Sequence, residues 1–274
     1  MVGELTWNRR LFGLWIPLVA LFVFALFPFT WMAATSLKTN AELYNPKAMP
    51  LAIQNPSLVH YIDLLKETNF LLWTANTMLV AVVSTAFSLL FGAMLAYPLA
   101  RMRFPGAALL AVTVAVTYLV PQTLLFVPMA DLISKLHLGN TLSAVILTYP
   151  TLLMPFCAWL LMGYFKTVPK ELEEAALIDG ASRWRAMTRV ILPLCMPGFI
   201  SAGIFAFTLS QNEFLYALLF LSRSTVRTVP IGVVGELIRG DAFYWGQLMA
   251  GAFLGSIPVV LIYSFYVKYY EAGI

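Results

Sequence analysis

The chain has 274 residues, of which 61% are hydrophobic and only 11% are charged, and its formal net charge is +4. A soluble domain usually carries about 25% charged residues, so this composition excludes an ordinary soluble protein and indicates a protein that is embedded in a lipid membrane. The apolar residues form long unbroken runs, whereas the strands of a membrane β-barrel alternate in polarity over about 10 residues.

Six long stretches that are nearly free of Asp, Glu, Lys and Arg predict six membrane helices. A helix needs roughly 20 apolar residues to cross a hydrocarbon core of about 30 Å. We expect the spans at about 11–35, 72–99, 107–130, 141–165, 197–221 and 245–267. The predicted fold class is therefore an all-α membrane protein with one transmembrane domain over residues 1–274.

The segment that follows the first span, residues 38–70, is expected to lie on the outer side of the membrane. It contains the turn signals Asn45-Pro46 and Asn55-Pro56, and residues 58–66 favour a short helix along the surface. Trp73, near the start of the second span, has the position of an aromatic belt residue at the membrane interface.

The distribution of basic residues predicts that both termini lie in the cytoplasm. With six alternating spans, the cytoplasmic side holds ten basic residues, namely Arg9, Arg10, Arg101, Arg103, Lys166, Lys170, Arg183, Arg185, Arg189 and Lys268. The outer side holds seven, namely Lys38, Lys47, Lys66, Lys135, Arg223, Arg227 and Arg239. Cytoplasmic loops carry the excess of Lys and Arg, so the loop 167–193 between the fourth and fifth spans is expected inside the cell.

The loop 167–193 has the pattern of two short helices. Pro169 suits a first helical turn, where its missing N–H is not needed, and acidic residues follow it where the helix dipole favours negative charge. Gly180 can supply the left-handed conformation that ends the first helix. Ser182 can cap the second.

The order of residues in this loop resembles the signature of permease subunits of bacterial ABC importers. Glu174-Ala175-Ala176 is followed by three residues and then Gly180, and nine further residues precede Val190-Ile191-Leu192-Pro193, with valine where isoleucine is usual. An ordinary basic loop at the membrane surface is the alternative interpretation. Phe104-Pro105-Gly106 and Asn212-Glu213-Phe214-Leu215 are also similar to carbohydrate-uptake permeases of the maltose-transporter type, so the resemblance covers nearly the whole chain.

The resemblance implies an inner-membrane heterodimer with a second permease, two ATPase subunits and an external substrate-binding protein. In that family a short cytoplasmic coupling helix docks into the ATPase, and the matching residues here are Glu174, Ala175, Ala176, Asp179, Gly180 and Ala181. The chain contains no Gly-Lys pair and hence no phosphate-binding loop. We therefore expect no cofactor in this chain, with ATP bound and hydrolysed by the partner subunit.

Glu213 is the only acidic or basic side chain inside a predicted span. A charge at the centre of a membrane helix costs about 2.5–3.5 kcal/mol, so such a carboxylate marks a functional site by default. The candidates for the substrate pathway are Asn212, Glu213, Gln211, Asn76 and Gln122. A structural bond to the partner permease is the favoured alternative for Glu213, because substrate contacts in the maltose-type family can fall mainly on the other permease. In the carbohydrate-uptake permeases that the chain resembles, an aromatic residue often precedes Asn-Glu, and Gln211 stands in its place here.

The expected function is transport of a sugar or related polyol by alternating access. An ion-coupled secondary transporter working without an ATPase is the alternative, but it usually shows inverted repeats, and none is evident. An enzyme would need a constellation of nucleophiles or paired acids, so we expect no catalytic residue. His60 and His137 lie in separate loops and Cys157 and Cys195 are single, so no metal site is expected. The expected contacts include membrane lipid and exclude nucleic acid.

Overall fold

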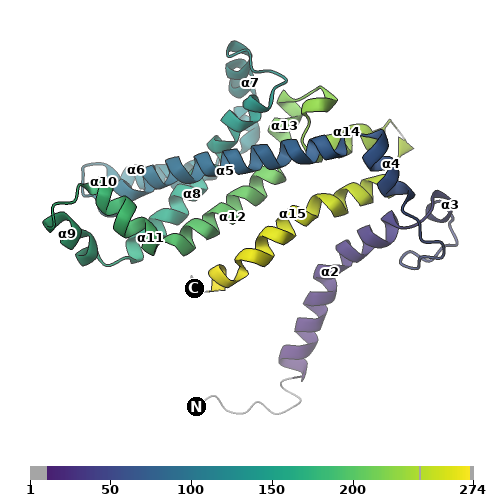
Figure 1. Ribbon diagram of the computed structural model, residues 1–274, viewed down its shortest axis with the longest axis horizontal. Helices are drawn as coiled ribbons and strands as arrows, with labels where there is room; N and C mark the ends of the chain where they lie inside the picture. The colour runs from purple at the N-terminus through teal and green to yellow at the C-terminus, as the bar shows by residue number, and fades with distance from the viewer. Residues whose placement is uncertain (1–10, 241, 272–274) are drawn as a thin grey trace. The chain divides into compact units, whose positions relative to one another are not determined.

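The computed structural model describes residues 11–240 and 242–271. These residues form two compact units. Unit 1 comprises the described residues up to Phe70 together with those of Val233–Ser256, and unit 2 comprises Leu71–Gly232 together with the described residues from Ile257 onward. The chain is mainly helical, as predicted, apart from one short pair of strands (Figure 1).

Unit 1 contains the first predicted span and the outer segment. Its elements are the π-helix η1 (Leu11–Trp15), α2 (Ile16–Ser36), α3 (Asn40–Leu43), α4 (Val59–Glu67) and the antiparallel strands β1 (Ile238–Arg239) and β2 (Ala242–Phe243). The helix α14 (Val229–Leu237) ends in this unit, and α15 (Trp245–Glu271) begins in it. The helix α4 confirms the short helix predicted at residues 58–66.

The first span is apolar on every side. The helix over Phe12–Ser36 is long enough to cross a membrane, and none of the residues in its most apolar window is buried by the described chain. Phe24, for example, is 80% exposed. A helix that is hydrophobic all round is stable only where lipid or other apolar protein surrounds it, so this element supports the membrane assignment.

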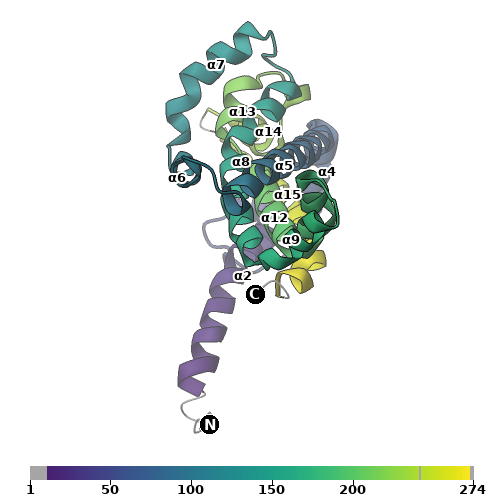
Figure 2. The same cartoon turned by 90° about the vertical axis from the view of Figure 1, so that its left-hand side faces the viewer.

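Unit 2 contains the remaining helices. They are α5 (Phe70–Arg101), α6 (Ala107–Tyr118), η2 (Gln122–Leu125), α7 (Phe126–Lys135), α8 (Leu142–Thr167), α9 (Lys170–Ile178), α10 (Arg183–Ala186), η3 (Met187–Ile191), α11 (Leu192–Leu194), α12 (Met196–Gln211), α13 (Leu215–Phe220) and η4 (Ser224–Val226). The core lies around α8, which packs against α6, α12 and α13 (Figure 2). Cys157 and Cys195 are buried free thiols in this core.

The described residues contain four helices that are long and apolar enough to cross a membrane, or up to six spans if each of two bent pairs counts as one. The third predicted span, 107–130, is divided by a bend of 96° between Ala107–Tyr118 and Gln122–Lys135. Pro121 at the break cannot donate a backbone hydrogen bond, which explains why the helix does not continue. The count of six spans stays a prediction.

Trp73 corrects a prediction from the sequence. Its side chain is fully buried rather than part of an exposed aromatic belt, and its indole Nε1 donates to the Ser224 carbonyl over 2.8 Å. The ring packs directly on the backbone of α14, because a Cβ at Gly232 would lie 2.3 Å from Cδ2 of Trp73. The start of α5 is therefore part of the core of unit 2.

His60 in α4 is buried against α15 within unit 1. A Cβ at Gly246 would lie 2.2 Å from its Nε2, and this nitrogen has no hydrogen-bond partner among the residues that the structure describes. Burial holds the pKa of His60 below its ordinary value of 6.5, although a hydrogen bond to the Lys38 backbone and the charge of Asp63 act in the opposite direction.

We expect unit 1 to lose stability in acid through His60. Because the folded-state pKa is below the unfolded-state value, the contribution is fully present above the unfolded pKa of 6.5 and is lost as the pH falls through the folded pKa. Thermal unfolding in detergent should show a smaller loss between about pH 7.5 and about pH 5 for His60→Gln, which does not titrate, than for the wild type. Equal losses in the two proteins would show that His60 is not the titrating group.

Candidate functional site

The helix α9 and the turn that follows it form the centre of the predicted coupling loop. The Ala181 N–H donates to the Ala176 carbonyl over 3.0 Å, and the Gly180 N–H donates to the Leu177 carbonyl over 3.1 Å. With Gly180 at φ +83°, these two bonds make a Schellman motif that satisfies the last carbonyls of the helix. Ser182 then accepts from the Arg185 N–H over 3.3 Å, so the helix end at Gly180 and the cap at Ser182 are both confirmed.

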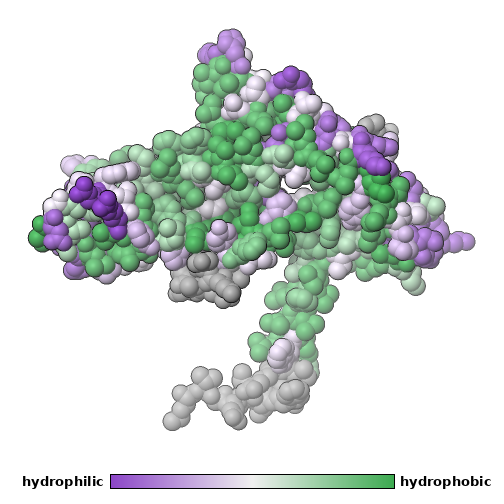
Figure 3. All heavy atoms as spheres, viewed as in Figure 1, coloured by the Kyte–Doolittle hydropathy of each residue, from purple (hydrophilic) through white to green (hydrophobic). Residues whose placement is uncertain are grey.

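The predicted coupling residues are largely accessible. Glu174, Ala175, Asp179 and Gly180 are exposed, whereas Ala176 and Ala181 are partly buried. Ile178, which the sequence analysis did not select, is 85% exposed at the end of α9, and Leu172 is 45% exposed. Figure 3 shows hydrophilic and hydrophobic residues side by side at the end of unit 2 where α9 and α10 lie. This surface combines charge, small side chains and an exposed aliphatic residue.

The opposite face of α9 is anchored by Glu173, which is 6% exposed. Its Oε2 lies 2.8 Å from Nε of Arg101, and its Oε1 accepts from the hydroxyl of Tyr97 over 2.5 Å. Arg183 is more distant, at 3.9 Å, and is exposed. Glu173 is one of the acidic residues after Pro169 that suit the helix dipole, and nothing local in the sequence distinguishes it from the exposed Glu174.

Arg101 also joins α9 to the end of α8. Its Nη1 donates to the carbonyls of Phe165 and Val168, at 3.2 and 2.7 Å, and its Nη2 donates to that of Pro169 at 3.3 Å. The last carbonyls of a helix have no intrahelical partner, so one guanidinium satisfies them and the Glu173 carboxylate together.

A cavity of about 630 Å³ lies in unit 2, at the break between α6 and η2 in the third predicted span and at the break between α12 and α13 in the fifth. It brings together three of the predicted pathway residues, Gln122, Asn212 and Glu213. The rest of its lining is Tyr118, Leu119, Val120, Pro121, Tyr149, Leu152, Leu153, Leu209, Ser210, Phe214 and Leu215. It therefore combines aromatic faces with amide and carboxylate groups and has no basic residue in its lining.

Glu213 has a structural role within this chain. Its two carboxylate oxygens accept from the backbone N–H groups of Tyr216 and Ala217, at 2.8 and 3.1 Å. An acidic group at a helix N-terminus satisfies free donors and complements the helix dipole, so Glu213 caps α13. Neighbouring Asn212 is exposed, and its Nδ2 donates to the Thr208 carbonyl over 2.9 Å.

The two other pathway candidates lie elsewhere. Asn76 is buried, and its Nδ2 donates to the carbonyls of Thr225 and Arg227 at 3.1 and 2.9 Å. It thereby holds the connection between α13 and α14 against α5. Gln211 is buried at the end of α12 and is absent from the lining of the cavity.

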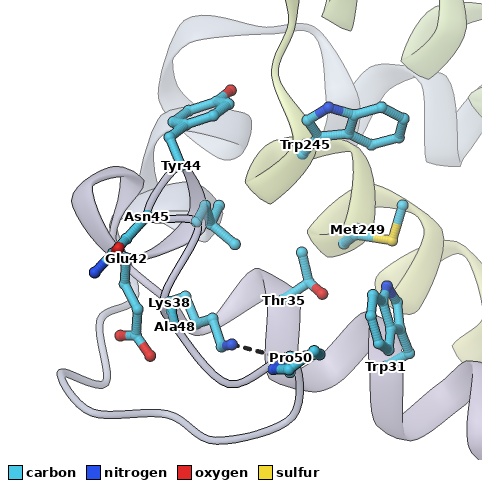
Figure 4. Close-up of a pocket in the computed structure, with 11 residues that line it drawn as sticks. Trp31, Thr35, Lys38, Glu42, Tyr44, Asn45, Ala48, Pro50, Trp245 and Met249 are labelled. Atoms are coloured by element: carbon cyan, nitrogen blue, oxygen red, sulfur yellow. Dashed lines mark hydrogen bonds between the residues drawn. The ribbon is translucent and has the colours of Figure 1, made fainter.

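A pocket of about 500 Å³ in unit 1 is lined by the aromatic residues Trp31, Tyr44 and Trp245 (Figure 4). Its charged groups brace the outer segment: Lys38 Nζ donates to the carbonyls of Met49 and Pro50, each at 2.8 Å. The Glu42 carboxylate accepts from the N–H groups of Gln54 and Asn55. These hydrogen bonds hold the outer segment in place and thereby shape the pocket.

No group of three or more His, Cys, Asp or Glu side chains that could hold a metal ion occurs within residues 11–240 and 242–271.

Comparisons with known proteins agree with the loop pattern. The chain is 37% identical to the sulfoquinovosyl glycerol transport system permease protein SmoH of Agrobacterium fabrum, over 88% of this chain and 84% of that protein. It is 31% identical to the trehalose/maltose transport system permease protein MalG of Thermococcus litoralis, over 94% and 93%. A chain in the crystal structure of a bacterial ABC transporter involved in alginate import has the same fold, with a TM-score of 0.82, 20% identity and coverage of 97% and 99%.

The model of one protein family, described as the binding-protein-dependent transport system inner membrane component, matches residues 88–274. This match includes the loop 167–193 and both interrupted spans of unit 2. The resemblance to permeases of carbohydrate importers is therefore confirmed, and the chain is a transport component rather than an enzyme. The chain belongs to the family of inner membrane components of binding-protein-dependent transport systems.

Proposed function

We propose that this chain is the permease subunit of an ATP-driven importer for a sugar or related polyol. It is a multi-pass inner-membrane protein, and its partners are a second permease, two ATPase subunits and an external substrate-binding protein. The observation that carries the proposal is α9, a short helix anchored on one face by buried Glu173 and accessible at Glu174, Ala175 and 178–180. Such an element offers a rigid contact surface to a separate protein.

The orientation follows from the basic residues. The excess of Lys and Arg supports a cytoplasmic position for the loop 167–193 and both termini, where an ATPase can reach α9. ATP binding would close the ATPase pair and move α9 with it, and the spans would change from inward-facing to outward-facing. The loaded external protein must bind the outward-facing state more tightly, because a ligand shifts an equilibrium only through its differential affinity.

The cavity at the two interrupted spans is the proposed contribution of this chain to the pathway. Tyr118, Tyr149 and Phe214 offer aromatic faces, and Gln122 and Asn212 offer amides that can bond hydroxyl groups. Since its lining holds a carboxylate and no basic residue, it suits an uncharged sugar better than an acidic one. The relatives named above include a trehalose/maltose permease, whose named cargo is uncharged, and a sulfoquinovosyl glycerol permease, whose named cargo carries a sulfonate. The preference for an uncharged cargo therefore rests on the lining of the cavity.

We expect Asn212→Ala to weaken uptake without affecting assembly. Loss of one net hydrogen bond to a sugar hydroxyl, about 0.5–1.5 kcal/mol, corresponds to a rise in KM of roughly two- to tenfold. The measurement is ATP-dependent uptake by the reconstituted complex, with Gln54→Ala, an exposed residue of the outer segment, as the matched control. An unchanged KM would remove Asn212 from the pathway.

Co-purification tests the proposed function. An affinity tag on this chain should retain the ATPase encoded with it, and Glu174→Arg or Gly180→Pro should abolish retention. Asp131→Arg, the same kind of charge reversal at an exposed position in α7, should leave retention intact. An ion-coupled transporter would instead move its substrate in liposomes without any ATPase, and that result would overturn the proposal.

A further inference from the structure

We infer that Tyr97, Arg101 and Glu173 form a joint that passes the movement of α9 to the membrane helix α5. The inference deepens the proposed function and rests on it. The three side chains are positioning residues: they lie behind the accessible surface of α9 and connect that helix to the C-terminal end of α5.

The joint is closed to water. The side chains of Arg101 and Glu173 are 2% and 8% exposed, and Tyr97 is 3% exposed. Charge-assisted hydrogen bonds are stronger than neutral ones, and a buried pair is screened much less by salt than a surface pair. The contact between α9 and α5 is therefore held in one arrangement.

The geometry also fixes the direction of α9. Tyr97 and Arg101 are four residues apart and lie on the same face of α5, and each bonds a different oxygen of the Glu173 carboxylate. A carboxylate held at both oxygens from one helix resists rotation as well as translation. The further bonds of Arg101 to the carbonyls of Phe165 and Val168 include the end of α8 in the same joint.

Apart from its packing on α10 and η3, α9 is connected to the neighbouring helices by two turns of the backbone. At its start the chain passes through Val168-Pro169, and at its end it passes through the glycine turn at Gly180. Both are points where backbone direction changes. Without the buried joint, a displacement of α9 would change only the backbone angles at these two turns. With the joint, a displacement of α9 also moves the last turn of α5.

The test measures the response of the cavity to ATP in the complete complex. A single reporter, Asn212→Cys, is placed in the cavity of unit 2, and its reaction with a membrane-impermeant maleimide is timed with and without ATP and vanadate. Cys157 and Cys195 are buried and serve as the background. The joint is then altered by Tyr97→Phe, which removes the hydroxyl that donates to Glu173 and, over 3.5 Å, to the Arg183 carbonyl, or by Glu173→Gln, which removes the charge. Arg183→Gln, at an exposed residue 3.9 Å from Glu173, is the matched control.

We expect ATP and vanadate to change the labelling rate at least about fivefold in the otherwise wild-type complex and in Arg183→Gln, as for a coupled site. In Tyr97→Phe and Glu173→Gln this response should be largely lost, although the ATPase subunits remain bound and still hydrolyse ATP. A residue with only a structural role would alter assembly or thermal stability instead. If assembled Tyr97→Phe and Glu173→Gln complexes keep the full response of the labelling rate to ATP, the proposed role of the joint is wrong. A wild-type chain that never retains an ATPase would instead overturn the proposed function.

Discussion

Gly232→Ala is expected to destabilise the folded protein strongly. A Cβ at this position would lie 2.3 Å from Cδ2 and 2.5 Å from Cε3 of Trp73. The ring cannot move aside easily, because it is fully buried and its Nε1 is bonded to the Ser224 carbonyl. Overpacking of a core costs about 1–3 kcal/mol and occasionally more, which corresponds to a fall in Tm of roughly 2–12 °C at about 2–4 °C per kcal/mol.

The matched control is Gly163→Ala in α8, where no atom lies within 4 Å of the added Cβ. This substitution should be neutral or slightly stabilising, since alanine is favoured over glycine in a helix by about 1 kcal/mol. Thermal unfolding of the two purified variants in the same detergent makes the comparison. Equal Tm values would show that the contact between α14 and Trp73 is not as tight as the structure has it.

Gly180→Val is expected to reduce the amount of ATPase that the chain retains, with little effect on the rest of the fold. Gly180 has φ +83°, and no atom lies within 4 Å of a Cβ built there, so the effect comes from the backbone and not from packing. The left-handed conformation costs about 1–2 kcal/mol for an ordinary residue, which changes the population of the native turn by a factor of about 5–30.

A graded series at Gly180 tests this cause. Gly180→Asn should stay close to wild type, because asparagine tolerates the left-handed region, and Gly180→Ala should be intermediate. Gly139→Val, at a glycine with open space and no positive φ, is the control for bulk. The measurement is the amount of ATPase retained by each purified variant. Equal retention by Gly180→Val and Gly180→Asn would contradict a role for this turn.

The outline of the fold and the ends of the coupling helix could be predicted because their signals are local. Uncharged stretches predict membrane helices from composition alone, and Gly180 and Ser182 act on the backbone within a few residues of themselves. The bend in the third span had a local signal, Pro121, although the uncharged composition of 107–130 gives no indication of its angle.

The contacts that connect distant parts of the chain could not be predicted in this way. Glu173 differs from Glu174 only because Tyr97 and Arg101 lie opposite it, and both belong to a helix more than seventy residues earlier. Asn76 has the composition of a pathway residue but bonds carbonyls about 150 positions later. Trp73 fits an interface by sequence and is buried because Gly232 leaves room for its ring.

Photo-crosslinking from position 178 tests the central claim most directly, because Ile178 is the most exposed large residue of the coupling helix, at 85%. With a photoreactive residue there, we predict an ATP-sensitive crosslink to the ATPase subunit, and none from position 109 on α6, where Leu109 is similarly exposed at 72%. A crosslink from position 178 to the external binding protein, or labelling of that position only from outside the cell, would contradict the account.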